Sequence, residues 1–339
     1  MGAAQCRCTP QQDLGTLVLV AKYPTPGKSK TRLGRAIGFE ESAKFARNAL
    51  VDLLHRYGDL DGLRKVILYA PLEARGEFEA LLKEQKLDAL WGLLPMTGGD
   101  NNIISSDLGS RLKSALRRVR MNPPEIRAKA TAAATVATAS ETVGFIGSDC
   151  LDITRKELRS LFLRVSRRDC EAAVLPADDG GYVSLVLGEC CPAAVFEGVK
   201  WSDSSTCVSQ LQALTRNRIT KVFIGESHSD VDEIEDLRSL HKRLAKLRPL
   251  DREIMGVRRT WDFLTELDEA LKLQRKPSSE SIAERGSVTA SEGADSKRSS
   301  GAAQILGRGI KASGSVHLET GDAANPNIEE AQQQQQQQQ

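Results

Sequence analysis

The chain has 339 residues, with 47 Lys+Arg against 45 Asp+Glu and a formal net charge of only +2 at pH 7. This near balance gives no overall positive field, so we expect no nucleic-acid partner. No stretch reaches the roughly eighteen consecutive apolar residues that a membrane-spanning helix requires, so we expect no transmembrane segment.

The composition changes along the chain. From residue 276 onward Ser, Gly, Glu, Ala and Lys replace the large apolar residues, and the chain ends in eight glutamines. This composition predicts a disordered, low-complexity tail over 276–339. Before it we expect a flexible N-terminus over 1–14, one folded domain over 15–250 and a helical extension over 251–275.

The N-terminus and the cysteines bear on location. The start Met-Gly-Ala-Ala-Gln-Cys resembles a lipidation signal at Gly2 and Cys6, although Ser or Thr is usual where Cys6 stands. We interpret the seven cysteines as reduced thiols and expect a cytoplasmic protein.

The first predicted element is a strand over 16–21, an unbroken apolar or β-branched run typical of a strand covered on both faces. A loop with Pro and Gly follows over 22–29. Apolar residues then recur every three or four positions and predict a helix. They are Phe39, Ala43, Ala46, Leu50, Leu53, Leu54 and Tyr57.

The alternation of strands and helices continues. Strands are predicted over 65–70 and 93–96, with a helix over 74–85 between them and another after Asp107. The run 122–140 opens with two prolines and continues in Ala and Thr, so we interpret it as a surface insertion.

The second half keeps the pattern, with a buried strand over 142–147 and a helix that starts with a capping box at Thr154 and Glu157. The remaining predicted elements are strands over 171–177, 181–187 and 221–225 and a closing helix over 232–247. This order predicts an α/β fold with three α/β/α layers, Rossmann-like, around a mostly parallel sheet.

The loop after the first strand is the first candidate site, with Lys28, Lys30 and Arg32 beside Gly27. Its Gly-Lys-Ser is not a Walker motif, because Lys22 stands where that motif needs a glycine. A solvated basic loop is the alternative. The position outside the carboxyl end of a strand favours a phosphate site.

Carboxylates supply the second candidate site. Asp149 follows a buried strand and is placed to hold Mg²⁺ or Mn²⁺, whereas Asp152 is interpreted as the start of a helix. In Asp230-Val231-Asp232, Asp232 is the natural second ligand, with a helix N-cap as its alternative role.

Other features keep two interpretations. Asp178, Asp179, Gly180 and Gly181 favour a hairpin turn over a substrate contact. Trp201 either lines a pocket or fills the core. The histidines form no cluster, which argues against histidine-based catalysis and a Ser-His-Asp hydrolase.

Six sequence blocks in this order resemble the nucleotide-diphospho-sugar transferase superfamily of GT-A fold. Within it they resemble the rSAM/selenodomain-associated transferases, or DUF-type glycosyltransferases. The chain departs from that pattern at Leu151, where proline is usual, and at Asp178, where glutamate is common. The blocks are 21–33, 107–112, 147–152, 176–182, 196–202, and 230–232 with 236–237.

The resemblance implies a role for each part of the site. Lys30, Arg32 and Asp149 would be catalytic, and Asp149 with Asp232 would hold Mg²⁺ or Mn²⁺. Asp179, Gly180, Gly181 and Trp201 would face an unidentified acceptor. The nucleotide would be bound by Ala21, Lys22, Pro26, Gly27, Lys30, Arg32 and Ser148.

We consider three functions, of which the first two are transfer reactions that the resemblance implies. The favoured one is metal-dependent glycosyl transfer from a nucleotide-diphospho-sugar. The alternative is nucleotidyl transfer, in which a phosphorylated acceptor attacks a nucleoside triphosphate and pyrophosphate leaves. A non-catalytic nucleotide-binding or scaffold protein ranks last, because Asp149 and Asp232 are both present. The oligomeric state stays open.

Overall fold

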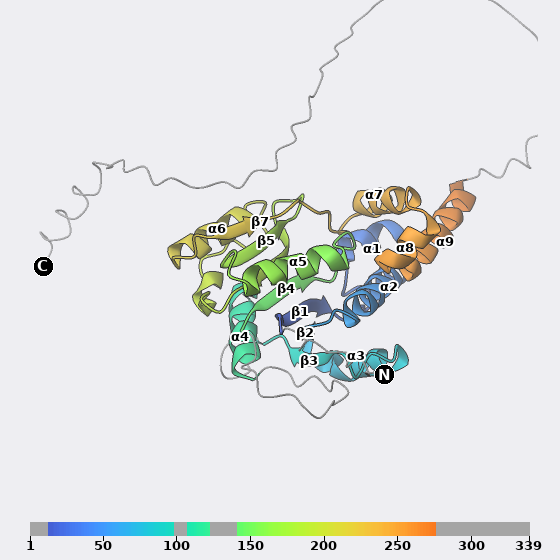
Figure 1. Ribbon diagram of the computed structural model, residues 1–339. Coiled ribbons are helices and arrows are strands. Elements are labelled where there is room, and N and C mark those ends of the chain that lie inside the picture. The colour runs from blue at the N-terminus through green and yellow to red at the C-terminus, as the bar shows by residue number, and fades with distance from the viewer. Residues whose placement is uncertain (1–12, 98–106, 123–140, 276–339) are drawn as a thin grey trace, which may run out of the picture. The chain divides into compact units, whose positions relative to one another are not determined.

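A seven-stranded sheet carries the fold of the computed structural model, which describes residues 13–97, 107–122 and 141–275 (Figure 1). Its strand order is β3-β2-β1-β4-β6-β5-β7. Only β6 runs antiparallel to its neighbours, so the predicted mostly parallel sheet is confirmed. The strands are β1 Gly15–Lys22, β2 Leu63–Ala70, β3 Gly92–Pro95, β4 Val143–Gly147, β5 Ala172–Pro176, β6 Tyr182–Leu187 and β7 Val222–Ile224.

Helices connect most of these strands. Two short 3₁₀ turns, η1 Leu72–Ala74 and η2 Ala193–Phe196, precede α3 and α6. The α-helices are α1 Thr31–Ile37, α2 Phe39–Gly58, α3 Arg75–Glu84, α4 Leu108–Met121, α5 Arg155–Ser166, α6 Thr206–Arg216, α7 Ile234–Ala245, α8 Pro249–Met255 and α9 Arg258–Arg275.

Alternate residues of the central strand β1 face two separate cores. Leu17 and Leu19 are fully buried with the apolar faces of α2, α3, α5, α7 and α9. Val18 is fully buried on the opposite face of the sheet with residues of α4, α6 and η2. The period of two thus places helices on both sides, which confirms the three-layer, Rossmann-like α/β/α arrangement.

Two helices were absent from the predicted elements. α1 directly follows the predicted loop over 22–29, and α6 follows a stretch rich in Ser and Asp. The buried face of α6 includes Cys207, Gln210, Ala213 and Leu214. Since only Leu214 among these is large and apolar, the periodic signal is weak.

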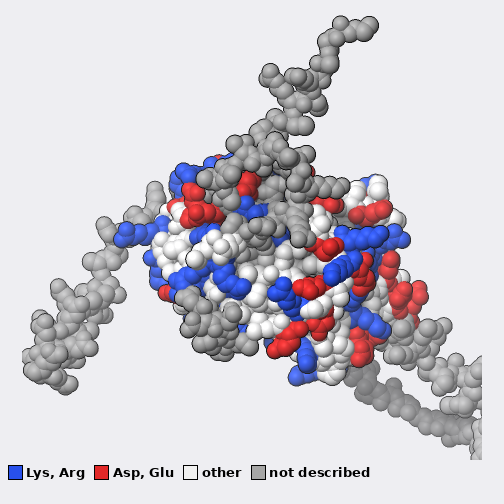
Figure 2. All heavy atoms as spheres, turned by 90° about the horizontal axis from the view of Figure 1, so that it is seen from below, with Lys and Arg blue, Asp and Glu red and all other residues white. Residues whose placement is uncertain are grey.

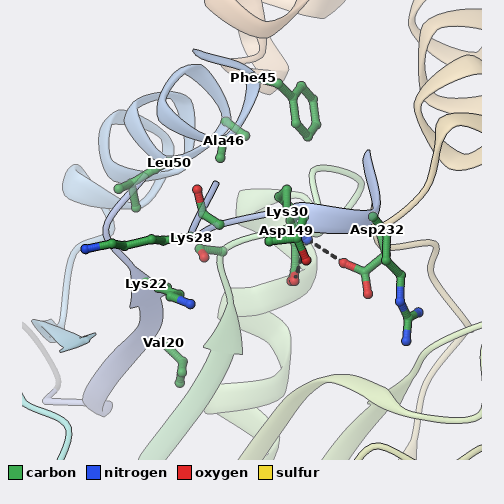
Figure 3. Close-up of a pocket in the computed structure, with 14 residues that line it drawn as sticks. Val20, Lys22, Lys28, Lys30, Phe45, Ala46, Leu50, Asp149 and Asp232 are labelled. Atoms are coloured by element: carbon green, nitrogen blue, oxygen red, sulfur yellow. Dashed lines mark hydrogen bonds and ion pairs between the residues drawn. The ribbon is translucent and has the colours of Figure 1, made fainter. Parts of the chain in front are cut away.

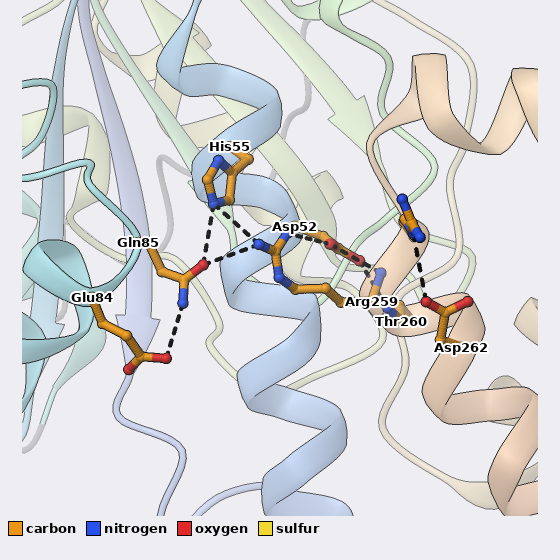
Figure 4. Close-up of polar contacts among 8 residues, drawn as sticks. Asp52, His55, Glu84, Gln85, Arg259, Thr260 and Asp262 are labelled. Atoms are coloured by element: carbon orange, nitrogen blue, oxygen red, sulfur yellow. Dashed lines mark hydrogen bonds and ion pairs between the residues drawn. The ribbon is translucent and has the colours of Figure 1, made fainter.

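A buried carboxylate ties α9 to α2 (Figure 4). Asp52 on α2 is 2% exposed and accepts hydrogen bonds from the backbone N–H groups of Thr260, at 2.8 Å, and Arg259, at 3.3 Å. These are orphan donors of the first turn of α9, so Asp52 caps a helix far from it in sequence. The Arg259 guanidinium continues the network to Gln85 after α3, at 3.1 Å.

Several expectations concern the chain beyond these elements. Residues 1–12, the predicted insertion after Asn122 and the tail 276–339 lie outside the described residues, as do Gly2, Cys6 and Cys8. The domain boundaries stay predictions. The five cysteines that the structure describes are free. None of the described helices is both long and apolar enough to cross a membrane.

Surface charge follows the balanced composition. On the face shown in Figure 2, Lys and Arg side chains lie interspersed with Asp and Glu. No large patch of one charge sign stands out on the part of this face that the structure describes.

Candidate active site

The loop after β1 folds into a tight turn that presents Lys30. The backbone N–H groups of Lys28 and Ser29 donate to the carbonyl of Thr25, and Gly27 has a φ of 71° that favours glycine. Lys30 itself has a left-handed backbone, with φ 47° and ψ 48°, just before α1. This uncommon conformation for a lysine places its side chain at the carboxyl edge of the sheet.

Two carboxylates converge on the Lys30 ammonium (Figure 3). Its Nζ lies 3.1 Å from Asp149 Oδ2, after β4, and 2.7 Å from Asp232 Oδ1, between β7 and α7. Residues 119 and 202 positions from Lys30 thus meet at one point. The predicted catalytic and metal-binding residues Lys30, Asp149 and Asp232 are therefore brought together.

The ion pairs set the protonation states of this group. Burial opposes the charge on Lys30, but Asp149 and Asp232 outweigh it and raise the lysine pKa above its ordinary value. Burial likewise opposes the charge on Asp149, and Lys30 still holds the pKa of that carboxyl below its ordinary value. Lys30 and Asp149 are consequently both charged at neutral pH.

A third carboxylate belongs to the cluster and was not predicted as a ligand. Oxygens of Asp149, Asp230 and Asp232 lie within 4.8 Å of one another. Burial, together with the charges of Asp149, Asp179 and Asp232, raises the pKa of Asp230 to about 6. Val231 between Asp230 and Asp232 is 1% exposed, and residues on either side of a buried one in an extended segment face the same way. The alternation Asp-Val-Asp is the corresponding pattern in the sequence.

This donor set fits a divalent cation. Carboxylate oxygens are the ligands that Mg²⁺ and Mn²⁺ prefer, and three of them converge here from two loops. The Lys30 ammonium is the positive charge that balances them in the structure.

Buried contacts hold the loop that carries Asp149. The Arg56 Nη1 donates to the carbonyls of Leu151, at 2.8 Å, and Ile153, at 2.9 Å, and the Tyr57 hydroxyl donates to Ile153 at 2.9 Å. Arg56 and Tyr57 lie on α2, so the helix packed beside the first loop also fixes the second.

Asp152 differs from its prediction as a helix start. Thr154 is the N-cap of α5 and accepts from the Glu157 N–H at 3.1 Å. Asp152 instead forms an ion pair with Arg243 of α7, at 2.8 Å. A carboxylate two positions before a cap is free for a tertiary contact, which local spacing does not reveal.

The first cavity is basic and has a volume of about 440 Å³. Its apolar wall comes from Phe45, Ala46, Ala49 and Leu50 of α2. The polar residues that line it are Lys22, Lys28, Ser29, Lys30, Thr31, Arg32, Ser148, Asp149 and Asp232.

The predicted nucleotide residues divide into two groups. Lys22, Arg32 and Ser148 line the first cavity with Lys30. Three others do not line it: Ala21 is 1% exposed and packs in the core, and Pro26 and Gly27 lie at the exposed turn.

A second cavity of about 420 Å³ adjoins the first and shares Val20, Arg32 and Asp232 with it. Among the residues predicted on the acceptor side, Asp179, Gly181 and Trp201 line it. Trp201 is half-buried and also packs against the core, so both of its predicted roles apply.

Gly180 has a structural role instead. Its φ is 90°, and a Cβ at this position would lie 1.9 Å from the carbonyl oxygen of Ser204. The turn that it occupies joins β5 and β6, which pair antiparallel, so the predicted strand pair is confirmed.

The described histidines have separate partners. His55 contacts Gln85, His228 contacts Glu157, and the His241 ring packs at a tilt against Trp261. Within the described ranges they form no common site, in agreement with the interpretation from sequence.

A comparison with protein families matches part of the chain. Residues 103–203 match a family described as "Uncharacterized protein conserved in bacteria (DUF2064)". No curated protein matches the chain.

Solved structures resemble the chain more widely. One is a protein from Desulfovibrio desulfuricans G20, provisionally named a nucleotide-diphospho-sugar transferase. It has 24% identity, a TM-score of 0.61, and coverage of 77% of this chain and 98% of that one. The 4-diphosphocytidyl-2C-methyl-D-erythritol synthase from Anaerococcus prevotii DSM 20548 has 11% identity and a TM-score of 0.43, covering 69% and 98%. The mannosyltransferase of Pyrobaculum calidifontis in complex with GDP-Man and Mn²⁺ has 11% identity and a TM-score of 0.39, covering 78% and 76%. At these identities, the likeness to the Desulfovibrio protein shows that the two chains share a fold.

Proposed function

We propose that the protein is a metal-dependent glycosyltransferase that uses a nucleotide-diphospho-sugar. The observation that carries the proposal is the meeting of Lys30, Asp149 and Asp232 where a basic and an acidic cavity adjoin. A donor diphosphate on one side and an acceptor on the other would place the reacting bond between them.

The first cavity suits the donor. Lys22, Lys28, Lys30 and Arg32 provide positive charge for a diphosphate, and the apolar wall of α2 provides a surface for the nucleoside. The cavity lies outside the carboxyl ends of β1 and β4, where ligands of open α/β sheets bind.

The carboxylate cluster would hold the metal. Asp149 and Asp232, with Asp230, would bind Mg²⁺ or Mn²⁺, and the bound metal would supply positive charge beside the diphosphate. Lys30 and Arg32 would stabilise the charge of the diphosphate from the protein side.

The reaction breaks the bond between the sugar anomeric carbon and the diphosphate oxygen and forms a bond from that carbon to an acceptor oxygen. The acceptor hydroxyl loses its proton. We assign this proton to Asp179, because Asp179 lines the second cavity. Asp179 is also near enough to the carboxylate cluster for its charge to raise the pKa of Asp230. Its Oδ1 accepts from the Gly181 N–H at 2.8 Å, which orients the carboxylate.

One observation favours nucleotidyl transfer as a second candidate. Four cations line the first cavity, a number that also suits the greater charge of a triphosphate. The leaving group would then be pyrophosphate instead of a nucleoside diphosphate.

Thermal unfolding with nucleotide-sugars and nucleoside triphosphates, each with and without Mn²⁺, tests the proposal. A nucleotide-sugar at saturation should raise the Tm by about 5 °C only when Mn²⁺ is present. Asp149→Asn should abolish the shift. Asp169→Asn, an exposed carboxylate after α5, is the matched control and should retain it. Stabilisation by a triphosphate alone would support nucleotidyl transfer, and no metal-dependent stabilisation by either would overturn the proposal.

A further inference from the structure

The second cavity differs from the first in charge and in aromatic content. We propose that it binds an acceptor of one class: a hydroxylated ring compound that carries no negative charge. The inference rests on the proposed function, because it takes the first cavity as the donor site. It also bears on the choice between the two candidate reactions, since the nucleotidyl transfer put forward above uses a phosphorylated acceptor.

The lining charge excludes anionic acceptors. Three carboxylates, Asp179, Asp203 and Asp232, line the second cavity, and Arg32 is the one cation among its described lining residues. Asp232 is paired with Lys30 at 2.7 Å, and Arg32, which is 69% exposed, lies 3.7 Å from Glu233. Asp179 and Asp203 therefore set the sign of the charge in this cavity. A phosphate or carboxylate here would meet more negative than positive charge.

Asp203 is a fixed acceptor of hydrogen bonds. Its Oδ1 accepts from the Ser205 N–H at 2.8 Å and from the Ser205 hydroxyl at 2.5 Å. These bonds lower the pKa of Asp203, so the carboxylate is ionised at neutral pH. An ionised carboxylate only accepts hydrogen bonds, and hydroxyl groups are the matching donors.

An aromatic pair supplies a surface for a ring. Tyr182 and Trp201 lie edge to face, with centroids 6.4 Å apart at an interplanar angle of 63°. The Tyr182 hydroxyl contacts Gln210 Oε1 at 3.2 Å, which fixes that ring. A Cβ on Gly109 would come within 2.7 Å of Trp201 Nε1, so α4 packs directly against the indole. Apolar ring faces stack on such surfaces while their hydroxyl groups reach the carboxylates.

The two walls are fixed to each other. The Cys207 N–H at the start of α6 donates to the Gly180 carbonyl at 2.9 Å, and Gly180 packs on Ser204. The turn with Asp179 and the segment with Asp203 therefore form a preformed site, which reduces the ordering cost of binding.

Trp201 provides the readout. The chain has three tryptophans, so Trp91→Phe with Trp261→Phe leaves Trp201 as the only indole, and its fluorescence reports on the cavity. The probes are matched pairs: methyl glucoside with glucose 6-phosphate, and myo-inositol with inositol 1-phosphate. Calorimetry on the unsubstituted protein gives the same affinities should the double variant fail to fold.

We expect at least one neutral probe to give a saturable change, with its phosphorylated partner binding ~10-fold or more weakly. Asp203→Asn should reduce the difference in affinity between the neutral probe and its phosphorylated partner, whereas the control Asp169→Asn should leave this difference unchanged. A phosphorylated probe that binds as tightly as its neutral partner, or no binding by either neutral probe, would overturn the inference.

Nucleotide binding in the same samples separates this inference from the proposed function. If the donor assignment is wrong, Mn²⁺-dependent nucleotide binding is lost while the Trp201 response to neutral rings persists. If the acceptor class is wrong, Mn²⁺-dependent nucleotide binding is intact, but the phosphorylated probe binds as tightly as its neutral partner or more tightly.

Discussion

Replacing Lys30 with methionine is predicted to have opposite effects on metal and on nucleotide binding. Methionine keeps most of the length of the side chain but removes the charge that lies 2.7 Å from Asp232 and 3.1 Å from Asp149. In the structure this ammonium neutralises the carboxylates that would bind Mn²⁺. In the proposed site, Lys30 would therefore compete with the metal until a phosphate draws it away.

The magnitude follows from the two contacts. At such distances an ion pair contributes ~1.4 kcal/mol in bulk water and ~6 kcal/mol at an effective dielectric constant of ~20. The side chains of Asp149 and Asp232 are 35% and 48% exposed, so screening keeps each contact near the lower value. If the two contacts together contribute about 2 kcal/mol, Mn²⁺ no longer has to displace that interaction in Lys30→Met and should bind roughly 30-fold more tightly. Without metal, the same loss should lower the free energy of unfolding by about 2 kcal/mol.

Calorimetric titration of Mn²⁺ into the nucleotide-free protein checks the affinity, and thermal unfolding with a chelator checks the stability. Lys156→Met, an exposed lysine on α5, is the matched control and should change neither. Nucleotide affinity in the presence of Mn²⁺ should fall in Lys30→Met. Unchanged or weaker Mn²⁺ binding in Lys30→Met would refute the reasoning, because the lysine would then not occupy the place of the metal.

Three further variants test the framework around the site. Burial raises the pKa of Asp52 above its ordinary 3.8 despite its backbone hydrogen bonds, so the native state holds this proton more tightly than the unfolded state does. The free energy of unfolding should therefore fall as pH rises from 3.8 through the native pKa. Urea unfolding at pH 4 and 7 measures this decrease, and Asp52→Asn should remove the part of it that Asp52 causes. Tyr57→Phe deletes a buried hydrogen bond to Ile153 and should cost about 1 kcal/mol by the same assay, whereas an unchanged midpoint would show that the bond contributes nothing. Gly180→Ala should cost about 2 kcal/mol or more and weaken ring binding at the second cavity, because its Cβ would meet the Ser204 carbonyl at 1.9 Å; full stability would contradict the described packing.

The sequence predicts the fold well where apolar residues are dense. The run over 16–21 lies within β1, and the stripe from Phe39 to Tyr57 lies within α2. α6 is missed because its buried face includes Cys207 and Gln210, which carry little periodic signal. Tertiary burial, which local spacing does not contain, stabilises that helix.

The candidate site shows the same division. Asp149 and Asp232 are predictable because carboxylates after strands of a parallel sheet gather at one edge. Their contact with Lys30 depends on the left-handed backbone of Lys30 itself, which no local sequence motif predicts. Asp230 joins the cluster through the burial of Val231 between the two carboxylates, and that burial is known only from the packing.

The most direct test of the proposed reaction is ³¹P NMR of the protein with Mn²⁺, a nucleotide-sugar panel and neutral ring acceptors. We predict that one nucleotide-sugar is converted to its nucleoside diphosphate, that the conversion requires Mn²⁺, and that Asp149→Asn abolishes it. Pyrophosphate released from a nucleoside triphosphate, with every nucleotide-sugar left intact, would contradict glycosyl transfer and assign the site to nucleotidyl transfer.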